Sequence, residues 1–324
     1  MTALKSTLFR IVAVLPVGLL ILGMAFLAWG TDFPQRLYLA AIVNFNFDCV
    51  EHVEEDYVYR MRRGFCEVAN LEYRTATTHD KNGRRNPDGA ADADYEIVVI
   101  GDSHAYGFGV DDAETFSQLL ARERRKRIYN LAVGSYSTKR ELASLVKHTK
   151  NEKIIILQYC DNDYRENLAA LRTDNASFVS TVRSNWRMIE EHYRTGKEKG
   201  VIVPLFFAAR SLKRLDFQSK SAFYAEAERR DIAGEAEAFA RVVAQYKNVL
   251  TGKKLIVFES SAHGKNARGF KAAFDAALKT HAAGTDFTVL DSSSFLTHDD
   301  YYFLDDHPTK EGHRKIAQQL APLL

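Results

Sequence analysis

Residues 96–103 read EIVVIGDS, a short apolar run that ends in a glycine, an aspartate and a serine. An apolar run of this length, closed by a turn residue, is typical of a strand that is buried on both faces of a parallel sheet. Polar residues that directly follow such a strand lie at the carboxyl edge of the sheet, where open α/β proteins bind their ligands. The stretch therefore predicts the first strand of an α/β domain and places Ser103 at its open edge.

Similar apolar runs alternate with helical patterns along the remaining chain. The further strands are expected at residues 127–133, 153–159, 255–258 and 287–290. The helices between and after them are expected at residues 112–125, 139–150, 265–281 and 309–323. This alternation predicts a three-layer α/β/α domain over residues 95–324, with helices on both faces of a parallel, flavodoxin-like sheet of five strands.

Residues 163–251 form an insertion between the third and fourth strands, and its pattern is mostly helical. Inside this insertion, residues 201–209 read VIVPLFFAA. Two interpretations of the apolar run stay open. It is either a core strand or an exposed surface that acts as a lid or faces a membrane or a partner protein.

Residues 11–30, IVAVLPVGLLILGMAFLAWG, contain no charged side chain. A helix of about twenty residues, rising about 1.5 Å per residue, is long enough to cross a bilayer. Lys5 and Arg10 precede the run and Asp32 follows it, which places residues 1–10 in the cytoplasm and the remainder outside. We expect a single-pass transmembrane anchor in the inner cell membrane with a periplasmic domain. The alternative is a cleaved signal peptide, whose apolar region is usually shorter.

Residues 31–94 are expected to be a connector of helix and loop between the anchor and the domain. Cys49 and Cys66 fall within it. These cysteines either form a disulfide, as an oxidising compartment allows, or remain two unpaired buried thiols. Cys160 follows the third expected strand and is expected to have no partner.

The charge pattern gives no reason to expect a nucleic-acid partner. The formal net charge is only +2, and the basic run at residues 122–127, RERRKR, has no interleaved aromatic residues. Such a run is typical of a solvated helix end. No HExxH or paired CxxC spacing predicts a metal site. A cofactor is not expected either, because Gly107 and Gly109 lack the third glycine of a dinucleotide-binding loop.

Residues at the ends of the expected strands suit one reaction, acyl transfer through a serine. Ser103 follows the first strand, Gly134 the second and Asn162 the third, and residues 305–307, Asp-Asp-His, precede the last helix. His307 would accept the proton of the Ser103 hydroxyl while a nearby carboxylate fixes the imidazole tautomer. The N–H groups of Ser103 and Gly134 and the amide of Asn162 would form an oxyanion hole, in which each donor typically contributes about 3–4 kcal/mol.

This ordered set resembles the SGNH/GDSL hydrolase family, whose sequence blocks are named after Ser, Gly, Asn and His. The blocks here are VIGDSHAYGFGV at residues 99–110, NLAVG at 130–134, DND at 161–163 and DDHPTKEGH at 305–313. In the same order, they are similar to the family's first block GDS(x)xxGxGV, to its second block, to its third block GxND and to its last block DxHPxxxGH. The stretch HDKNGRRN at residues 79–86 is similar to the polar N-G-x-R stretch of membrane-linked members. The likeness covers about residues 75–324, apart from much of the insertion.

The resemblance implies a membrane-anchored serine esterase with Ser103 as nucleophile, His307 as base and Asp305 as orienting acid. Two departures from the family pattern matter. The usual glycine before Asn-Asp is replaced in the run Cys160-Asp161-Asn162. The acid commonly stands three residues before His, where this chain has Leu304; Asp305 fits the DxH form, and Asp306 stays the second candidate.

Three functions remain open on the sequence. The first is hydrolysis of an acyl ester of a glycan or lipid. The second is transfer of the acyl group to an exported polysaccharide, which the sequence GDSH at residues 101–104 favours by its likeness to acyltransferase-associated SGNH domains. The third is a non-catalytic subunit of a membrane assembly that binds a membrane protein partner through the anchor, the connector or the run at residues 201–209.

Overall fold

The computed structural model describes residues 47–69, 72–87, 94–199, 230–302 and 305–324, together with residues 18, 20, 21, 23 and 24. Among these residues, no helix has both the length and the apolar character needed to span a bilayer. The expected membrane span at residues 11–30 lies outside the described residues except for those five positions. The apolar run at residues 201–209 lies outside them entirely.

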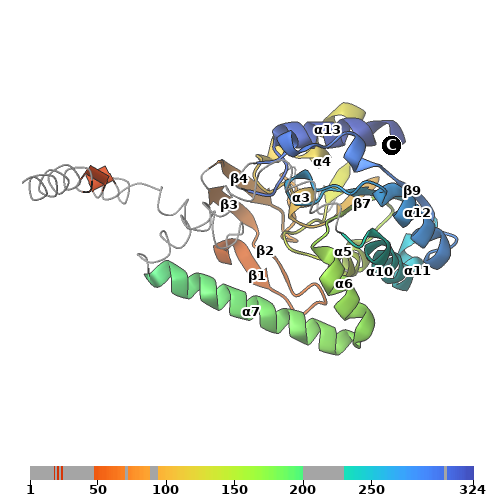
Figure 1. Ribbon diagram of the computed structural model, residues 1–324, viewed down its shortest axis with the longest axis horizontal. Coiled ribbons are helices and arrows are strands. Elements are labelled where there is room, and N and C mark those ends of the chain that lie inside the picture. Colours follow the sequence, from red (N-terminus) through yellow and green to blue (C-terminus); the bar gives the residue numbers. More distant parts are fainter. Residues whose placement is uncertain are drawn as a thin grey trace, which may run out of the picture.

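A parallel sheet of five strands forms the centre of the domain (Figure 1). Its strands are β5 (Ile97–Ile100), β6 (Ile128–Asn130), β7 (Ile154–Tyr159), β8 (Lys254–Glu259) and β9 (Asp286–Val289). They lie in the order β6-β5-β7-β8-β9, and each neighbouring pair is parallel. The predicted α/β class, the five strands and the parallel sheet are confirmed.

Helices cover both faces of this sheet. One face packs against α5 (Thr138–His148), α6 (Asp163–Arg172), α10 (Ile232–Gln245) and α12 (Phe270–His281). The other packs against α4 (Phe116–Arg124) and α13 (Lys310–Leu320). The remaining helices are α3 (Ser103–Tyr106), α7 (Asn175–Lys199) and α11 (Lys247–Leu250), with 3-10 turns at Phe47–Cys49, Asp112–Glu114, Ala262–Gly264, Ser292–Ser294, His298–Asp300 and Ala321–Leu323.

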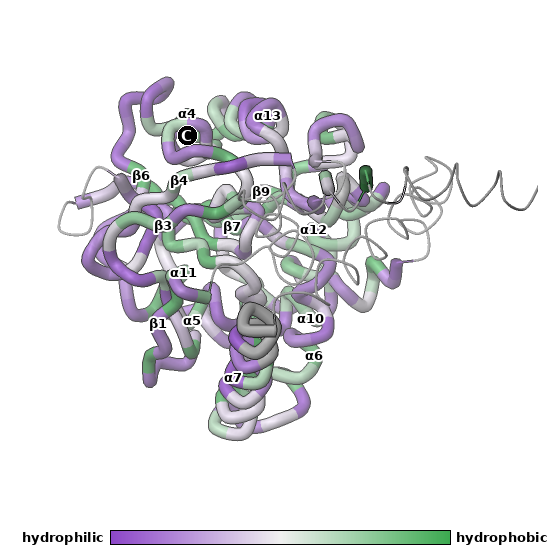
Figure 2. The backbone as a smooth tube through the Cα atoms, turned by 90° about the vertical axis from the view of Figure 1, so that its left-hand side faces the viewer, coloured by the Kyte–Doolittle hydropathy of each residue, from purple (hydrophilic) through white to green (hydrophobic). Residues whose placement is uncertain are grey.

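Strands β5, β6, β7 and β8 are buried on both sides because their side chains alternate between two hydrophobic cores. Ile97 and Val99 of β5 face the core under α4 and α13, whereas Val98 and Ile100 face the core under α10 and α12. Figure 2 shows hydrophobic residues along the central strands and mixed colours on the surrounding helices. Burying one such side chain stabilises the fold by about 1.5–3 kcal/mol, so the apolar run that identifies the strand also holds it at the centre.

The connector expected to be helix and loop forms two antiparallel hairpins in its described part, and the helical expectation is wrong there. The first hairpin pairs β1 (Val50–His52) with β2 (Tyr59–Met61), and the second pairs β3 (Gly64–Ala69) with β4 (Arg74–His79). Strand β4 of the second hairpin, RTATTH, is rich in threonine, and β-branched side chains fit a pleated sheet better than a helix. Thr75, Thr77 and His79 point to the buried side.

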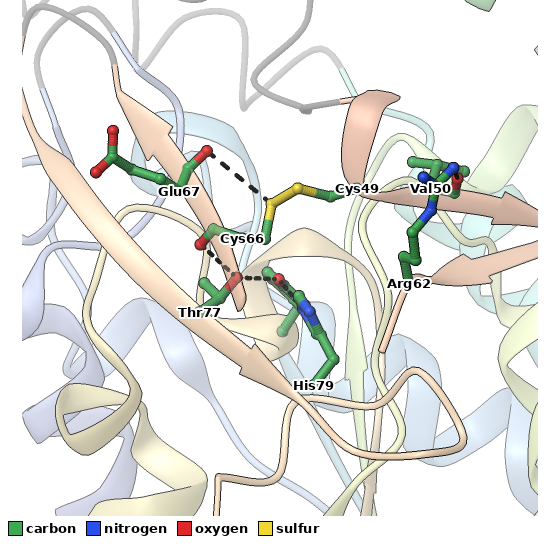
Figure 3. The surroundings of a disulfide bond; sticks show 8 residues. Cys49, Val50, Arg62, Cys66, Glu67, Thr77 and His79 are labelled. Atoms are coloured by element: carbon green, nitrogen blue, oxygen red, sulfur yellow. Dashed lines mark hydrogen bonds between the residues drawn. A yellow bond between two sulfur atoms is a disulfide. The ribbon is translucent and has the colours of Figure 1, made fainter. Parts of the chain in front are cut away.

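A disulfide joins Cys49 to Cys66 and thereby ties the two hairpins together (Figure 3). The sequence left open whether these cysteines form a disulfide or stay as two unpaired thiols, and the structure shows the disulfide. The hydroxyl of Thr77 donates to the carbonyl oxygen of Cys66 at 3.2 Å, which fixes the bridge against β4. Cys160 is a free, buried thiol, as expected.

The described part of the insertion is helical, as predicted, and comprises α6, α7, α10 and α11. In Figure 1, α7 runs alongside the β1–β2 hairpin. The Trp186 ring of α7 lies 4.4 Å from the ring of Tyr59 and 5.6 Å from that of Phe47. Arg183 also forms a 2.7 Å ion pair with Glu54. The N-terminal hairpin therefore holds α7 against the domain.

Candidate active site

Ser103 is the first residue of the short helix α3, directly beyond β5. The preceding Asp102 caps this helix, because its carboxylate accepts a 2.8 Å hydrogen bond from the His104 N–H. Gly101 makes the turn possible. A Cβ at that position would lie only 2.6 Å from the Ala105 Cβ and from Gln158 Oε1. Any larger residue would push the serine turn away from the sheet.

Arg85 holds the loop that follows α3. Its guanidinium donates to the carbonyl oxygens of Tyr106 at 3.1 Å and Val110 at 2.6 Å, and also to that of Gly107. A 2.8 Å ion pair with Asp112 completes the arrangement, and the Arg85 side chain is only 1% exposed. This gives the N-G-x-R stretch a structural role, since it supplies hydrogen bonds to the carbonyls at the end of α3.

His307 and Asp305 form a buried pair on the loop before α13. His307 Nδ1 is hydrogen-bonded to Asp305 Oδ1, and the His307 backbone N–H donates to the same oxygen at 3.2 Å. Asp306 Oδ1 lies 3.3 Å from Nδ1, but its side chain is 35% exposed, whereas that of Asp305 is 1% exposed. Of the two candidate acids, Asp305 is thus the one held against the imidazole.

Opposing effects set the pKa of His307. Burial by itself lowers the pKa, because it penalises the charged imidazolium. The Asp305 carboxylate, through its charge and its hydrogen bond, outweighs burial and raises the pKa of His307 to about 9. In the free protein at neutral pH the imidazole is therefore mainly protonated, and it becomes a base as the pH rises.

The second hairpin contributes two contacts to Asp305 that the sequence did not indicate. The hydroxyl of Tyr73 donates to Asp305 Oδ2. The Asp305 backbone N–H donates to Glu72 Oε2 at 2.7 Å. Tyr73 and Glu72 directly precede β4, in a segment that carries no family motif, so only the folded chain brings them to this loop.

The loop of His307 packs against the helix of Ser103. The His307 ring lies 4.9 Å from the ring of His104, the residue after Ser103, and 4.9 Å from the ring of Phe108. Within the described part of the chain, the Ser103 hydroxyl forms no hydrogen bond with His307. The two residues thus belong to one region of the fold, without direct bonding in this conformation.

Gly134 and Asn162 lie at the ends of β6 and β7, as expected. The Gly134 carbonyl accepts a 2.6 Å hydrogen bond from the Tyr59 hydroxyl, and its N–H has no acceptor among the described residues. Asn162 is the exposed residue before α6. Its amide donates to Asp102 Oδ2 at 3.3 Å, beside the serine turn. An amide group has two N–H donors, so one remains for a ligand.

His104 is a further buried group that sequence analysis did not single out. Its Nδ1 lies 2.9 Å from Ser260 Oγ, which in turn lies 3.0 Å from the Tyr301 hydroxyl. Burial lowers the pKa of His104, so its ring stays neutral beside His307. The only sequence signal for it is its place in GDSH at residues 101–104, and its contacts with Ser260 and His307 come from the folded chain.

Two groups of side chains within the described residues have the spacing of metal ligands, Asp102 with His104 and Cys160, and residues 305–307. The Asp102 carboxylate accepts from the His104 N–H and the Asn162 amide, and the His307 imidazole bonds Asp305.

A family model described as "GDSL-like Lipase/Acylhydrolase family" matches residues 99–315. No curated protein sequence is significantly similar to this chain. Among solved structures, a protein described as lipolytic and of the G-D-S-L family from Desulfitobacterium hafniense has a TM-score of 0.39 and 9% identity, over 71% of this chain and 100% of that one.

Two carbohydrate-active structures are also similar in fold. A family two carbohydrate esterase from Cellvibrio japonicus has a TM-score of 0.37 and 14% identity, over 70% of this chain and 59% of that one. The acetylxylan esterase Axe2 from Geobacillus stearothermophilus has a TM-score of 0.35 and 12% identity, over 70% of this chain and 93% of that one. None of these likenesses identifies a substrate for this chain.

Proposed function

Since the chain belongs to the GDSL-like lipase/acylhydrolase family and is an SGNH-type serine hydrolase acting on ester bonds, we propose that Ser103, His307 and Asp305 are its nucleophile, base and orienting acid. One observation carries the assignment of the acid and base. Asp305 and His307 form a buried, hydrogen-bonded pair whose imidazole packs against the residue that follows Ser103. In serine hydrolases of unrelated folds, a carboxylate likewise holds the catalytic histidine in its working orientation.

In the proposed reaction, Ser103 Oγ attacks the ester carbonyl carbon as His307 Nε2 takes the hydroxyl proton. The carbonyl oxygen gains the negative charge and is stabilised by the N–H groups of Ser103 and Gly134 and by the Asn162 amide. The tetrahedral intermediate then expels the alcohol, which receives the proton from His307. Water, activated by the same imidazole, releases the acid from Ser103 and restores the enzyme.

The test of this proposal is active-site labelling combined with turnover of p-nitrophenyl acetate. We expect Ser103→Ala to abolish labelling by a fluorophosphonate and to reduce turnover by roughly 10⁴-fold or more. Ser184→Ala, an exposed serine on α7, is the matched control and should behave as the parent protein. Labelling that persists in Ser103→Ala would reject the assignment.

Acyl transfer to an exported polysaccharide is the alternative proposal, and the GDSH sequence at residues 101–104 supports it. It uses the same acyl-enzyme, with a sugar hydroxyl in place of water. Incubating the protein with an acyl donor and a glycan separates the two reactions. Acylated glycan in the mass spectrum supports transfer, whereas release of free acid alone supports hydrolysis.

We further propose that the domain is periplasmic and anchored by residues 11–30. The uncharged run supports this location, and so does the disulfide between Cys49 and Cys66, because such bonds persist in oxidising compartments. Protease added to intact spheroplasts should degrade the domain, and a thiol reagent should modify Cys49 only after reduction. A protein that resists protease until the membrane is permeabilised would contradict the proposal.

A further inference from the structure

A cavity of about 730 Å³ opens beside the proposed oxyanion hole. Asn162 lines it, and so does Ser135, the residue directly after Gly134. Its remaining walls come from α6, from the loop and helix after β6, and from α7 of the insertion. The volume falls in the range of about 300–1,000 Å³ that is typical of small-molecule sites. Ser103, Gly134 and His307 do not line the cavity, so it meets the proposed oxyanion hole at Asn162.

The two sides of the cavity differ in chemistry. On the α7 side, the lining side chains of Phe178, Val182 and Trp186 are apolar and buried. On the opposite side, Glu166 receives two hydrogen bonds from Arg140, at 2.6 Å to Oε1 and 2.9 Å to Oε2. The cavity is thus apolar along one wall and charged along the other.

Polar groups at the cavity still have hydrogen-bonding capacity. Arg140 is 1% exposed, and within the described part of the chain its Nη1 has no hydrogen-bond partner. Arg165 and Asn185 line the mouth and are exposed. The Arg140 guanidinium is covered by the rings of Tyr136, at 5.0 Å, and Tyr59, at 5.6 Å. The donors that a ligand can reach are therefore the exposed side chains at the mouth, and they favour a ligand that brings oxygen atoms.

A fatty acyl chain fits this environment poorly, because its methylene groups would lie against Glu166 and Arg165 and remove water from their charges. A pyranose ring fits both walls, since one face of the ring presents C–H groups and its edge presents hydroxyl groups. We propose that the cavity binds a sugar unit of the alcohol part of the ester. The substrate class is then a carbohydrate carrying a short O-acyl group. This inference rests on the proposed function.

Two series of esters test the proposal with the full-length protein. In the first, the acetyl group is constant and the alcohol varies, from ethyl acetate to mono-O-acetylated methyl glucosides and galactosides. We expect kcat/KM to be at least tenfold higher for the sugar esters. In the second, the p-nitrophenol is constant and the acyl chain lengthens from acetate to decanoate, and we expect no gain.

Matched pairs of variants locate the preference in the cavity. Arg165→Ala and Asn185→Ala should lose at least fivefold of kcat/KM for the sugar esters, mainly through a higher KM. Arg172→Ala on α6 and Ser184→Ala on α7 are exposed, lie outside the cavity lining and should keep the parent values.

The outcomes separate failure of this inference from failure of the proposed chemistry. Sugar esters that react no faster than ethyl acetate, or a rate that rises with acyl-chain length, would overturn the sugar site. Fluorophosphonate labelling of Ser103, measured on the same samples, tests the chemistry alone. Labelling without a sugar preference rejects only the cavity proposal, whereas absence of labelling rejects the nucleophile.

Discussion

The hydroxyl of Tyr59, in the first N-terminal hairpin, donates a 2.6 Å hydrogen bond to the carbonyl oxygen of Gly134, at the end of the second strand of the sheet. This contact fixes the Gly134–Ser135 peptide and thereby restrains the backbone of Gly134, whose N–H we propose as an oxyanion donor. The second hairpin reaches the opposite side of the site through Tyr73 and Asp305. The segment before the family's first block therefore holds both halves of the proposed active site.

The first prediction concerns Tyr59→Phe. The variant leaves the Gly134 carbonyl buried without its donor, which costs about 1–3 kcal/mol of unfolding free energy. It also frees the Gly134–Ser135 peptide to turn, which loosens the backbone of Gly134 and the aim of its N–H. We therefore expect kcat for p-nitrophenyl acetate to fall about tenfold, less than the 10²–10³-fold typical of a deleted donor. Steady-state kinetics and urea denaturation measure the two effects.

Tyr246→Phe is the control for this variant. Its hydroxyl also donates to a backbone carbonyl, that of Lys139 on α5 at 3.3 Å, and not to that of Gly134. A loss of kcat that is equal in both variants would show that Tyr59 acts only through general stability.

The second prediction concerns Tyr73→Phe. Without the phenol donor, more of the Asp305 charge is available to His307, so the pKa of the imidazole should rise further. We expect the rising part, or limb, of the pH–rate profile to move to higher pH. We also expect kcat to fall by roughly 10- to 100-fold, consistent with about 1.5–3 kcal/mol for a hydrogen bond to a charged group. Tyr302→Phe, which loses a 2.8 Å hydrogen bond to the Gly109 carbonyl, should leave the limb in place.

The third prediction is the pH dependence of the parent enzyme. Only neutral His307 can accept the Ser103 proton, and the Asp305 carboxylate, against the effect of burial, raises its pKa to about 9. We expect kcat/KM to increase with pH and to level off above about pH 9. Asp305→Asn removes the charge that raises this pKa, so the limb should move to lower pH while kcat falls steeply. Asp306→Asn should shift the limb much less.

The same titration affects stability with a definite sign. The ordinary pKa of histidine is about 6.5, and the folded protein raises that of His307 to about 9. The stabilisation is therefore fully present below about pH 6.5 and is lost as the pH rises through 9. Urea denaturation at pH 6 and pH 10 should show that the parent loses more unfolding free energy over this range than Asp305→Asn does. Equal losses of unfolding free energy in the two proteins would show that the His307–Asp305 pair is not the source of this pH dependence.

The fourth prediction concerns the disulfide. Cys49 and Cys66 are 17 residues apart, and opening a loop of this size costs about 3 kcal/mol in the chain-entropy model. We expect reduction, or the double variant C49S/C66S, to lower the unfolding free energy by about that amount. Activity should fall with it, since the bridge ties together the hairpins that carry Tyr59 and Tyr73. Cys160→Ser should retain the response to reductant, because that thiol is outside the bridge.

Local sequence was enough to predict the sheet. Residues 96–100, 153–159 and the other apolar runs form strands within a few residues of the expected bounds, because a strand buried on both faces must be apolar throughout. The hairpins were missed because their strands are short and polar residues break their pattern. Their stability comes from the disulfide and from packing against α7, which a local pattern does not contain.

By itself, the sequence determined that Ser103, Gly134 and Asn162 lie at the carboxyl ends of neighbouring strands, since parallel strands start and end together. The tertiary structure alone decided that Asp305 rather than Asp306 bonds His307, that Tyr73, 232 residues earlier, supports that carboxylate, and that α7 closes a cavity beside Asn162. The physical reason is the distance along the chain over which each effect acts. Backbone periodicity acts over a few residues, whereas a hydrogen bond or a cavity wall depends on which distant segments pack together.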